Sequence, residues 1–485
     1  MKLLRELLYG CPLDSVSGDT NIAISSIFID SKKVSSLGVF VAINGVNTNG
    51  HKFINQAISL GAIAIICEEL PKKTHHQVTY VKVMNSSYVL GVMASNFFNN
   101  PSSNIRLIGI TGTNGKTSTA YYLFDLFQKL NFKVGLISTI ENKINQQSFE
   151  SKHTTPNALE INELLSLMVQ EGCDFCFMEV SSHGIDQNRI IGLNFSIAVF
   201  SNISRDHLDY HKSFEHYKNT KKKFFDNLSQ NAISIVNKDD NYCSNILSDT
   251  KSKKIFYGIN SKSHYQASIV ESNLFGLSLE IDRHNITTRL IGDFNAYNLL
   301  AVYAIALQLG QDSIRVLKLL SNISPVPGRF NIIRSPKHDV VGIVDYAHTP
   351  DALQKVISSI SNFCNPKQDL IIVLGCGGNR DQGKRPIMGK IAFESSSQII
   401  LTSDNPRFED PQLIIDDMCL DLPKETHNKV HKIQNREEAI YFAFNQVKTE
   451  SVVLVAGKGH EKFQEIRDNK TPFDDSKIIT NILNT

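Results

Sequence analysis

The stretch that decides the fold reads I-G-I-T-G-T-N-G-K-T-S and spans residues 108–118. It overlaps the end of a mostly apolar run, 105–110, typical of a buried parallel strand, and leads into residues 117–130, whose apolar positions recur at helical spacing. A glycine-rich turn at a helix N-terminus offers free backbone N–H groups and the positive end of the helix dipole, and both favour phosphate. We therefore predict a polyphosphate-binding loop.

The loop also carries useful side chains. Lys116 can place a positive charge between the β- and γ-phosphates, and the hydroxyl of Thr117 or Ser118 can reach a magnesium ion. The pattern G-x-x-x-x-G-K-[ST] has Ile110 in place of its first glycine, so this is a shortened form, T-G-T-N-G-K-T. The predicted ATP-binding residues of the loop are Gly112, Thr113, Asn114, Gly115, Lys116, Thr117 and Ser118.

Length and composition limit the possible classes. A chain of 485 residues is too long for one hydrophobic core and suggests roughly three domains of about 150 residues. A net charge of +2 favours neither nucleic acid nor an anionic membrane as a partner. We expect no membrane span and no secretory signal. The eight cysteines are scattered, several within apolar strands, which indicates reduced thiols in a cytoplasmic protein.

Turn-forming segments predict the domain boundaries. N-N-P-S-S at 99–103 and S-P-V-P-G-R at 324–329 are rich in residues that break regular structure. We expect an α/β fold with domains over residues 1–98, 99–327 and 328–485. In the central and last parts, strand patterns alternate with helical patterns, which is typical of a parallel sheet covered on both faces. Ligands of such sheets bind beyond the carboxyl ends of the strands.

Polar residues stand at several predicted strand ends of the central part. Glu179 closes the strand 175–180, where a carboxylate beside the phosphate loop could hold magnesium. The cluster R-D-H-L-D-Y-H follows at 205–211. Three consecutive lysines at 221–223 read first as a solvated helix face, but residues one and two positions on lie about 100° and 200° around a helix, so only one of them can face the loop. Asn295 and Asn298 share one helix face and could contact a nucleotide.

Four strands of the last part also end in polar or glycine-rich loops. These loops are D-Y-A-H-T-P-D at 345–351, G-C-G-G-N-R-D at 375–381, D-N-P-R at 404–407 and G-K-G-H-E at 457–461. Arg380, Lys384 and Arg385 could meet carboxylates or phosphates. We predict a second ligand site there.

Taken together, these motifs resemble the Mur ligases, ATP-dependent amide-forming enzymes of peptidoglycan synthesis, over essentially the whole chain. The shared motifs are, in order, T-G-T-N-G-K-T, M-E-V-S-S-H-G, R-D-H-L-D-Y-H, G-x-F-N-x-x-N, P-G-R-F, D-Y-A-H-T-P and G-K-G-H-E. D-N-P-R resembles the motif of members that add meso-2,6-diaminopimelate, whereas lysine-adding relatives generally lack its arginine. A guanidinium at Arg407 can grip the second carboxylate of diaminopimelate, whereas L-lysine would bring another cation there.

The resemblance implies a UDP-binding first domain, a central P-loop domain and a Rossmann-like last domain that closes over the site. It implies UDP-substrate contacts at Ile29, Ser31, the loop 46–48, Thr154, Thr155, Ser181, Gln187 and Arg189. It adds Asn295, Arg329 and Asp345 to the ATP site. It implies diaminopimelate contacts at Arg380, Asp404, Asn405, Pro406, Arg407, Gly457 and Glu461.

The resemblance also implies the chemistry. The γ-carboxylate of D-glutamate attacks the γ-phosphate of ATP, and the amine of diaminopimelate then displaces phosphate from the acyl phosphate. Members carboxylate a lysine to a carbamate, and motif spacing points to Lys221. The implied catalytic residues are Lys116, Glu179, His207 and Lys221, and the implied Mg²⁺ ligands are Thr117, Glu179, His207 and the carbamate of Lys221. UDP-N-acetylmuramoyl-dipeptide is the implied second substrate, and we expect a monomer.

Four alternatives remain at this point. A lysine-adding ligase of the same subfamily is the nearest. Folylpolyglutamate synthetase shares the P-loop and the acyl phosphate but lacks a counterpart of residues 1–98. A module that hydrolyses ATP only as a conformational switch would not need the pocket around Arg380 and Arg407, and a scaffolding protein would need none of these loops.

Overall fold

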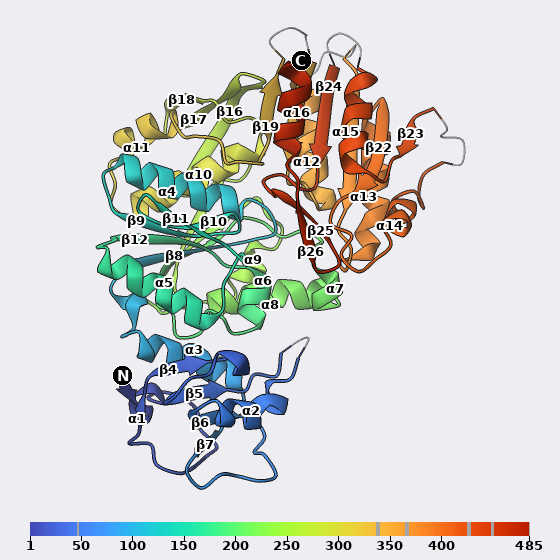
Figure 1. The fold of residues 1–485 in the computed structure, drawn as a ribbon. Coiled ribbons are helices and arrows are strands. Elements are labelled where there is room, and N and C mark those ends of the chain that lie inside the picture. Colours follow the sequence, from blue (N-terminus) through green and yellow to red (C-terminus); the bar gives the residue numbers. More distant parts are fainter. Residues whose placement is uncertain (46–47, 336–339, 364–367, 424–427, 448–450, 485) are drawn as a thin grey trace.

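The computed structural model describes residues 1–45, 48–335, 340–363, 368–423, 428–447 and 451–484. Three larger sheets follow one another along the chain, and helices pack against each of them (Figure 1). Among the described residues, no helix has both the length and the apolar character needed to cross a membrane. The chain has the predicted α/β fold class.

The first sheet lies within the N-terminal part of the chain. Its order is β2 (Ser15–Ser17), β7 (Thr79–Lys82), β6 (Ala62–Cys67), β5 (Gly38–Val41) and β4 (Ser26–Phe28). The last four strands are mutually parallel, and β2 is an antiparallel edge. Helix α3 (Ser86–Phe97) packs its apolar face against this sheet and leads to the Pro101 turn before the central sheet.

The central sheet has eleven strands and a parallel middle. Its order is β11 (Gln147–Glu150), β10 (Glu141–Ile144), β9 (Val134–Ile137), β12 (Phe175–Glu179), β8 (Arg106–Thr111), β13 (Phe195–Phe200), β14 (Ile233–Asn237), β15 (Lys253–Gly258), β16 (Tyr265–Asn273), β17 (Gly276–Ile281) and β18 (His284–Thr288). The strands from β9 to β16 run parallel, and antiparallel strands extend both edges. The predicted strands 105–110 and 175–180 are β8 and β12.

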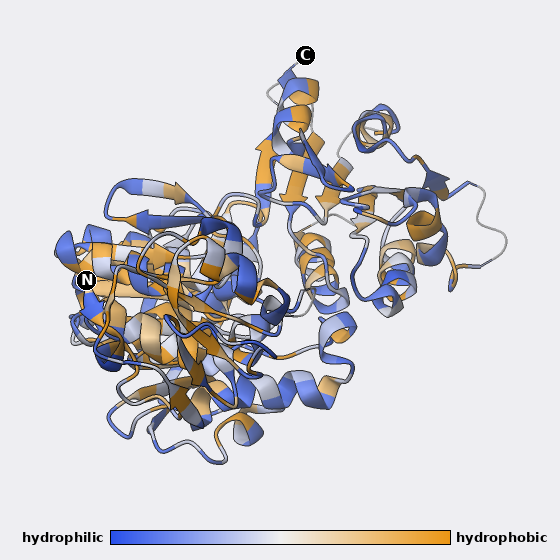
Figure 2. Cartoon of the chain, turned by 60° about the horizontal axis from the view of Figure 1, so that its bottom comes forward, coloured by the Kyte–Doolittle hydropathy of each residue, from blue (hydrophilic) through white to orange (hydrophobic). Residues whose placement is uncertain are grey.

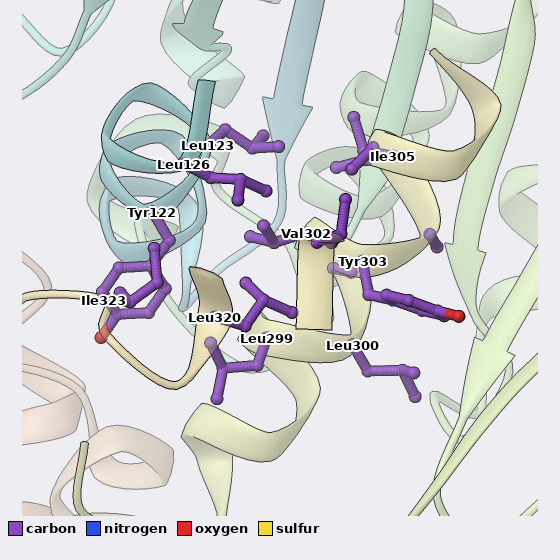
Figure 3. Packing of buried hydrophobic residues seen from close by; sticks show 14 of the residues in the cluster. Tyr122, Leu123, Leu126, Leu299, Leu300, Val302, Tyr303, Ile305, Leu320 and Ile323 are labelled. Atoms are coloured by element: carbon purple, nitrogen blue, oxygen red, sulfur yellow. The ribbon is translucent and has the colours of Figure 1, made fainter. Parts of the chain in front are cut away.

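Two helices build the core over one face of this sheet. Helix α4 (Lys116–Lys129) begins at the phosphate loop, and α10 (Phe294–Gln308) packs beside it. Leu123, Leu126, Leu299 and Val302 are all fully buried between them (Figure 3). Helix α10 is covered by other elements on nearly all sides, and its residues are accordingly apolar on nearly all sides. Asn295 and Asn298 lie in its first turns, next to α4.

The last sheet has the order β19 (Asn331–Arg334), β20 (Val340–Asp345), β24 (Ser451–Ala456), β21 (Leu370–Cys376), β22 (Gln398–Ser403) and β23 (Val430–Lys432). All except β19 are parallel. Helices α12 (Pro350–Phe363), α13 (Arg385–Ser395) and α14 (Pro411–Met418) cover one face, and α15 (Arg436–Asn445) and α16 (Asp475–Asn484) cover the other. Figure 2 shows the hydrophobic residues concentrated in these strands.

A small hairpin follows the last parallel strand of that sheet. It consists of β25 (Phe463–Ile466) and β26 (Asn469–Pro472), which pair antiparallel. An isolated bridge joins Ile466 to Arg407, so the hairpin rests on the loop after β22. Because β20, β21, β22 and β24 are parallel, their four following loops meet at one edge of the sheet.

Candidate functional site

The phosphate loop connects β8 to α4 in a conformation that needs glycine. Gly112 and Gly115 have φ values of +149° and +87°, and a Cβ at Gly112 would come within 2.0 Å of Ser201 Oγ. Ile110 is fully buried within β8, so the turn begins two residues later than in the longer pattern. Lys116 is the first residue of α4, and its Nζ donates to the carbonyls of Gly112 and Thr113, at 2.7 Å each. Its ammonium group is thus held against the loop.

Glu179 reaches the same place from the carboxyl end of β12. It is fully buried, and its Oε2 accepts a hydrogen bond of 2.9 Å from the Thr117 hydroxyl. Its Oε1 accepts the backbone N–H of Thr139 at 2.8 Å. Arg329, from the segment before β19, donates through Nη2 to Thr117 Oγ1 at 3.2 Å. Residues far apart in the chain therefore meet at the first turn of α4.

His207 adds an imidazole beside these groups. Burial lowers the pKa of His207 well below its ordinary value, against the opposing effect of Asp206, so the ring is neutral, the form that binds metal ions. Burial alone would raise the pKa of Asp206, but His207, Lys384 and His348 more than offset it and hold the pKa below its usual range. The Asp206 carboxylate lies 3.2 Å from His207 Nε2 and 3.7 Å from Lys384 Nζ.

Helix α8 (Phe214–Asp226) distinguishes the three consecutive lysines. Lys221 is 1% exposed, and its Nζ donates to the carbonyl of Gly112 at 2.9 Å. Lys222 points instead to Asp226 and Asp249, and Lys223 is exposed. Burial, and next the nearby Lys116, place the pKa of Lys221 well below its ordinary value. Lys221 is the lysine of this run that faces the phosphate loop.

The fit of a magnesium ion can be judged from the donors. No three His, Cys, Asp or Glu side chains are grouped as a preformed metal site within the described ranges. The Thr117 hydroxyl and the Glu179 carboxylate are adjacent, however, and oxygen donors suit Mg²⁺, which keeps several waters and takes others from substrate phosphates. The residues fit an ion whose shell is completed by a bound nucleotide.

The loops of the last sheet form a second group of charged residues. Arg407 donates through Nε to Glu465 Oε2 at 3.0 Å and through Nη1 to the carbonyl of Gly378 at 2.9 Å. Asn405 Nδ2 donates to Glu461 Oε2 at 2.7 Å. Burial, and next Asp404, raise the pKa of Glu461. Basic and acidic groups thus stand side by side, as a ligand with carboxylate and ammonium groups requires.

The residues predicted for the UDP substrate form a third group. Arg189 donates through Nη1 to the carbonyl of Thr155 at 2.6 Å and through Nη2 to Gln187 Oε1 at 2.7 Å. The backbone N–H of Ser181 donates to Thr155 Oγ1 at 2.9 Å. This network joins the loop before α5 to the start of α6 (Ser182–Asp186).

One cleft of about 1230 Å³ connects the three groups. Most predicted site residues line it, and these are Thr113, Asn114, Gly115, Lys116, Thr117, Ser118, Thr154, Thr155, Glu179, Ser181, Gln187, Arg189, His207, Lys221, Arg329, Asp345, Arg380, Asp404, Asn405, Arg407, Gly457 and Glu461. Contacts between the central and last parts close it. Asn114 Nδ2 donates to Asp351 Oδ2 at 2.8 Å, and Arg205 Nε lies 3.5 Å from Asp381 Oδ2.

Several predicted residues do not line this cleft. Thr48 is exposed elsewhere, and the buried guanidinium of Arg385 pairs with Glu409 and Asp417 instead of facing a ligand. Gly112 is part of the phosphate loop, but it is not in the cleft lining, and its carbonyl accepts hydrogen bonds from Lys116 Nζ and Lys221 Nζ. Asn295 is buried and accepts the side-chain amide of Asn298, which does line the cleft. Pro406 is also not part of the lining. Ile29 and Ser31 lie just after β4 of the first sheet, and the Ser31 hydroxyl donates a hydrogen bond to Gln56 Oε1. Of the predicted loop 46–48, residues 46–47 lie outside the described residues.

The chain is similar to known proteins over nearly its whole length. Three family models match successive parts of the chain: Mur ligase family, catalytic domain, at residues 23–98; Mur ligase middle domain at 110–306; and Mur ligase, glutamate ligase domain, at 328–459. A protein of Bacteroides thetaiotaomicron named UDP-N-acetylmuramoyl-L-alanyl-D-glutamate--2,6-diaminopimelate ligase is 46% identical over 482 residues, covering 99% of this chain and 100% of its own length. A Clostridium acetobutylicum protein with the same name, numbered 1, is 39% identical and covers 99% of both chains.

Solved structures agree with these matches. A structure of a UDP-N-acetylmuramoyl-L-alanyl-D-glutamate--2,6-diaminopimelate ligase is 30% identical, with a TM-score of 0.68, and covers 99% of this chain and 98% of its own. The MurF ligase of Thermotoga maritima in complex with ADP has a TM-score of 0.61 at 20% identity, covering 90% and 94%. At that identity the likeness concerns the fold alone.

Proposed function

This chain belongs to the Mur ligase family, and from that premise we propose that it is an ATP-dependent ligase that adds meso-2,6-diaminopimelate to UDP-N-acetylmuramoyl-L-alanyl-D-glutamate. The observation that carries the proposal is the single cleft that joins the phosphate loop to the pocket around Arg407 and Glu461. A nucleotide and an amino acid bound there would share one enclosed space. The reaction is the formation of an amide with release of ADP and phosphate.

The first step activates the acid. The γ-carboxylate of the D-glutamate residue attacks the γ-phosphorus of ATP, the bond to the β–γ bridging oxygen breaks, and ADP leaves an acyl phosphate behind. Lys116 and Arg329, both close to Thr117, neutralise charge on the transferred group, and such positioning and electrostatics provide most of the catalysis in phosphoryl transfer. Gly115, Ser118 and Asp345 complete the nucleotide site in this proposal.

Magnesium and a carbamate belong to the same proposal. Thr117, Glu179, His207 and a carbamate on Lys221 would hold the ion, which when bound screens phosphate charge. The low pKa of Lys221 supports the carbamate, because the neutral amine is the form that adds to carbon dioxide and then loses a proton. A carbamate on Lys221 would also place an anion beside the Lys116 ammonium group, and the attraction between the two would stabilise the modified form.

The second step forms the amide bond. The amine of diaminopimelate attacks the acyl carbon, phosphate leaves, and the nitrogen loses a proton. Arg407 would bind the distal carboxylate, Glu461 would bind an ammonium group with Asn405 holding its carboxylate, and Arg380 lies at the same edge of the cleft. Contacts such as that of Asn114 with Asp351 enclose the site, so water is kept from the acyl phosphate.

The finer features follow from the same reading. We propose residues 1–98, 99–327 and 328–485 as the UDP-binding, ATP-binding and amino-acid-binding domains, with Ile29 and Ser31 in contact with the UDP group. We expect a monomer that acts in the cytoplasm, because its nucleotide substrates are found there.

The test uses purified protein, the UDP-linked dipeptide, ATP and Mg²⁺, with either meso-diaminopimelate or L-lysine. We expect phosphate release only with the complete mixture, a tripeptide product by mass spectrometry and a clear preference for diaminopimelate. Equal or better turnover of L-lysine would overturn the specificity. Phosphate release that needs no amino acid would indicate a nucleotide-driven switch instead.

A further inference from the structure

Lys458 is a fully buried lysine at the edge of the amino-acid pocket. It stands in the turn after β24, between Gly457 and Gly459, whose φ values are +113° and +53°. A Cβ at Gly457 would come within 2.7 Å of Asp404 Oδ2, and one at Gly459 within 2.6 Å of the carbonyl of Gly328. The two glycines therefore allow the tight turn that buries Lys458 beneath the cleft.

The contacts of Lys458 go to the residues that face the cleft. Its Nζ donates to Asn405 Oδ1 at 2.9 Å and to Glu461 Oε2 at 3.0 Å, and lies 4.0 Å from Asp404 Oδ1. Asn405, Glu461 and Asp404 all line the cleft, whereas Lys458 does not. Lys458 therefore does not line the cleft itself and acts on a ligand there through these side chains.

We propose that Lys458 is a positioning residue of the amino-acid site: it holds the Glu461 carboxylate, directly and through the Asn405 amide, in the orientation that receives the ammonium group of the incoming amino acid. The inference rests on the proposed function, since it assumes that an amino acid binds at Asn405 and Glu461.

The orientation of the Asn405 amide shows how Lys458 acts. Asn405 Oδ1 accepts two donors, Lys458 Nζ and the backbone N–H of Glu465, each at 2.9 Å. With its oxygen occupied in this way, the amide must turn its NH₂ group toward Glu461, to which it donates at 2.7 Å. Without Lys458, the amide would lose one of the two donors that fix its orientation.

The charge of Lys458 has a separate role. Glu461 and Asp404 are two carboxylates in a buried place. Burial and the repulsion from Asp404 raise the pKa of Glu461, and the Lys458 ammonium group opposes both effects. Tyr346 and Arg436 also interact electrostatically with Glu461. An ionised Glu461 pairs with an ammonium group, whereas a protonated Glu461 does not. An apolar residue would fill a purely structural position without the cost of burying a charge.

The test compares Lys458→Met with Lys470→Met. The Nζ atoms of Lys458 and Lys470 both lie over the Phe463 ring, at 5.8 Å and 4.3 Å from its centroid. Lys470, in β26, is exposed, and within the described ranges it has no hydrogen bond to Asn405 or Glu461. We expect Lys458→Met to raise the KM for diaminopimelate roughly 10- to 100-fold, with the KM for ATP and kcat little changed. The ratio of its KM to that of the wild type should fall as pH rises, because Glu461 regains its charge. Lys470→Met should match the wild type.

Two further variants keep the outcome decisive. In a Glu461→Gln background, Lys458→Met should have a much smaller effect, because the carboxylate that it serves is gone. If Lys458→Met does not fold, Lys458→Gln retains a donor for Asn405 without the charge and should show the same pH-dependent KM ratio. An unchanged KM, or equal losses for all three substrates at every pH, overturns the inference. A wild type that ignores diaminopimelate would refute the proposed function instead.

Discussion

Arg407→Ala removes the guanidinium proposed to bind the distal carboxylate of diaminopimelate. Glu465 holds Nε, and the carbonyl of Gly378 holds one N–H of Nη1. Within the described part of the chain, Nη2 has no hydrogen-bond partner, so a carboxylate would bind at the Nη1–Nη2 edge. The substitution keeps a Cβ at this residue, whose φ is +51°, so the backbone strain stays the same.

The structure also sets the size of the effect. Losing one partner of a buried charge pair costs about 2–5 kcal/mol. The side chain of Arg407 is 22% exposed, so solvent screens the pair and the lower part of that range applies. We expect a loss of about 2–3 kcal/mol, or roughly 30- to 150-fold in kcat/KM for diaminopimelate. The preference over L-lysine should narrow by a similar factor.

The assay measures phosphate release against diaminopimelate concentration, with Arg467→Gln as the control for charge in the same hairpin. Arg407→Ala leaves Glu465 unpaired, so Arg407→Ala/Glu465→Gln separates lost attraction from new repulsion. The double variant should remain impaired. An unchanged KM in the single variant, or full recovery in the double variant, would refute a direct contact between Arg407 and the substrate.

Three further predictions concern other parts of the molecule. Lys221→Met should abolish amide formation. Lys222→Met should retain activity within about threefold of the wild type, because surface ion pairs such as those of Lys222 contribute little. Equal losses of activity for the two variants in the same assay would contradict the role of Lys221. Burial lowers the pKa of His460 to about 3, so His460 stays neutral in the folded chain while the unfolded chain takes up a proton below pH 6.5, and stability is lost as pH falls. By about pH 5 this loss of stability amounts to at most about 2 kcal/mol. The thermal midpoint of His460→Gln should therefore fall less than that of the wild type between neutral pH and pH 5. An equal fall in both proteins would argue against a buried neutral His460. Leu299→Ala should lower the free energy of unfolding by about 2–5 kcal/mol in denaturant titrations, because Leu299 is fully buried between α4 and α10; a loss below about 1 kcal/mol would mean that the packing is looser than described.

Features contained in a continuous stretch were the most predictable from sequence. The phosphate loop needs a strand, two glycines and a helix start, and all of them stand within residues 106–119. Glu179 was identifiable because it ends an apolar strand. The prediction that the strands run parallel also placed the polar loops together, since the loops after parallel strands share one edge of the sheet.

The choice among the three lysines was also encoded in the sequence. Tyr217, Lys221, Phe224 and Phe225 recur at helical spacing and form the buried face of α8, so Lys221 shares its face with aromatic residues. Lys222 and Lys223 fall outside that face. The apolar phase of the helix was a stronger signal than the lysine run itself.

Residues that act through long-range pairing could not be found in the same way. Glu465 lies in a short strand of mixed polarity, and its role depends on the bridge between the hairpin and Arg407. Asp206 was visible only as part of a motif, and its contacts with Lys384 and His348 join two domains. Asn295 and Asn298 share a helix face in the sequence pattern, yet Tyr122 packs against Asn295 and removes it from the cleft wall.

The central claim is that ATP energises the acid directly in a cleft shared with the amine. The most direct measurement starts from UDP-linked dipeptide labelled with oxygen-18 in the γ-carboxylate of its D-glutamate residue. Attack on ATP and later displacement by the amine transfer one labelled oxygen to the released phosphate, which mass spectrometry detects. The account predicts one labelled oxygen in each phosphate. Unlabelled phosphate, released at the same rate as the amide product, would contradict it.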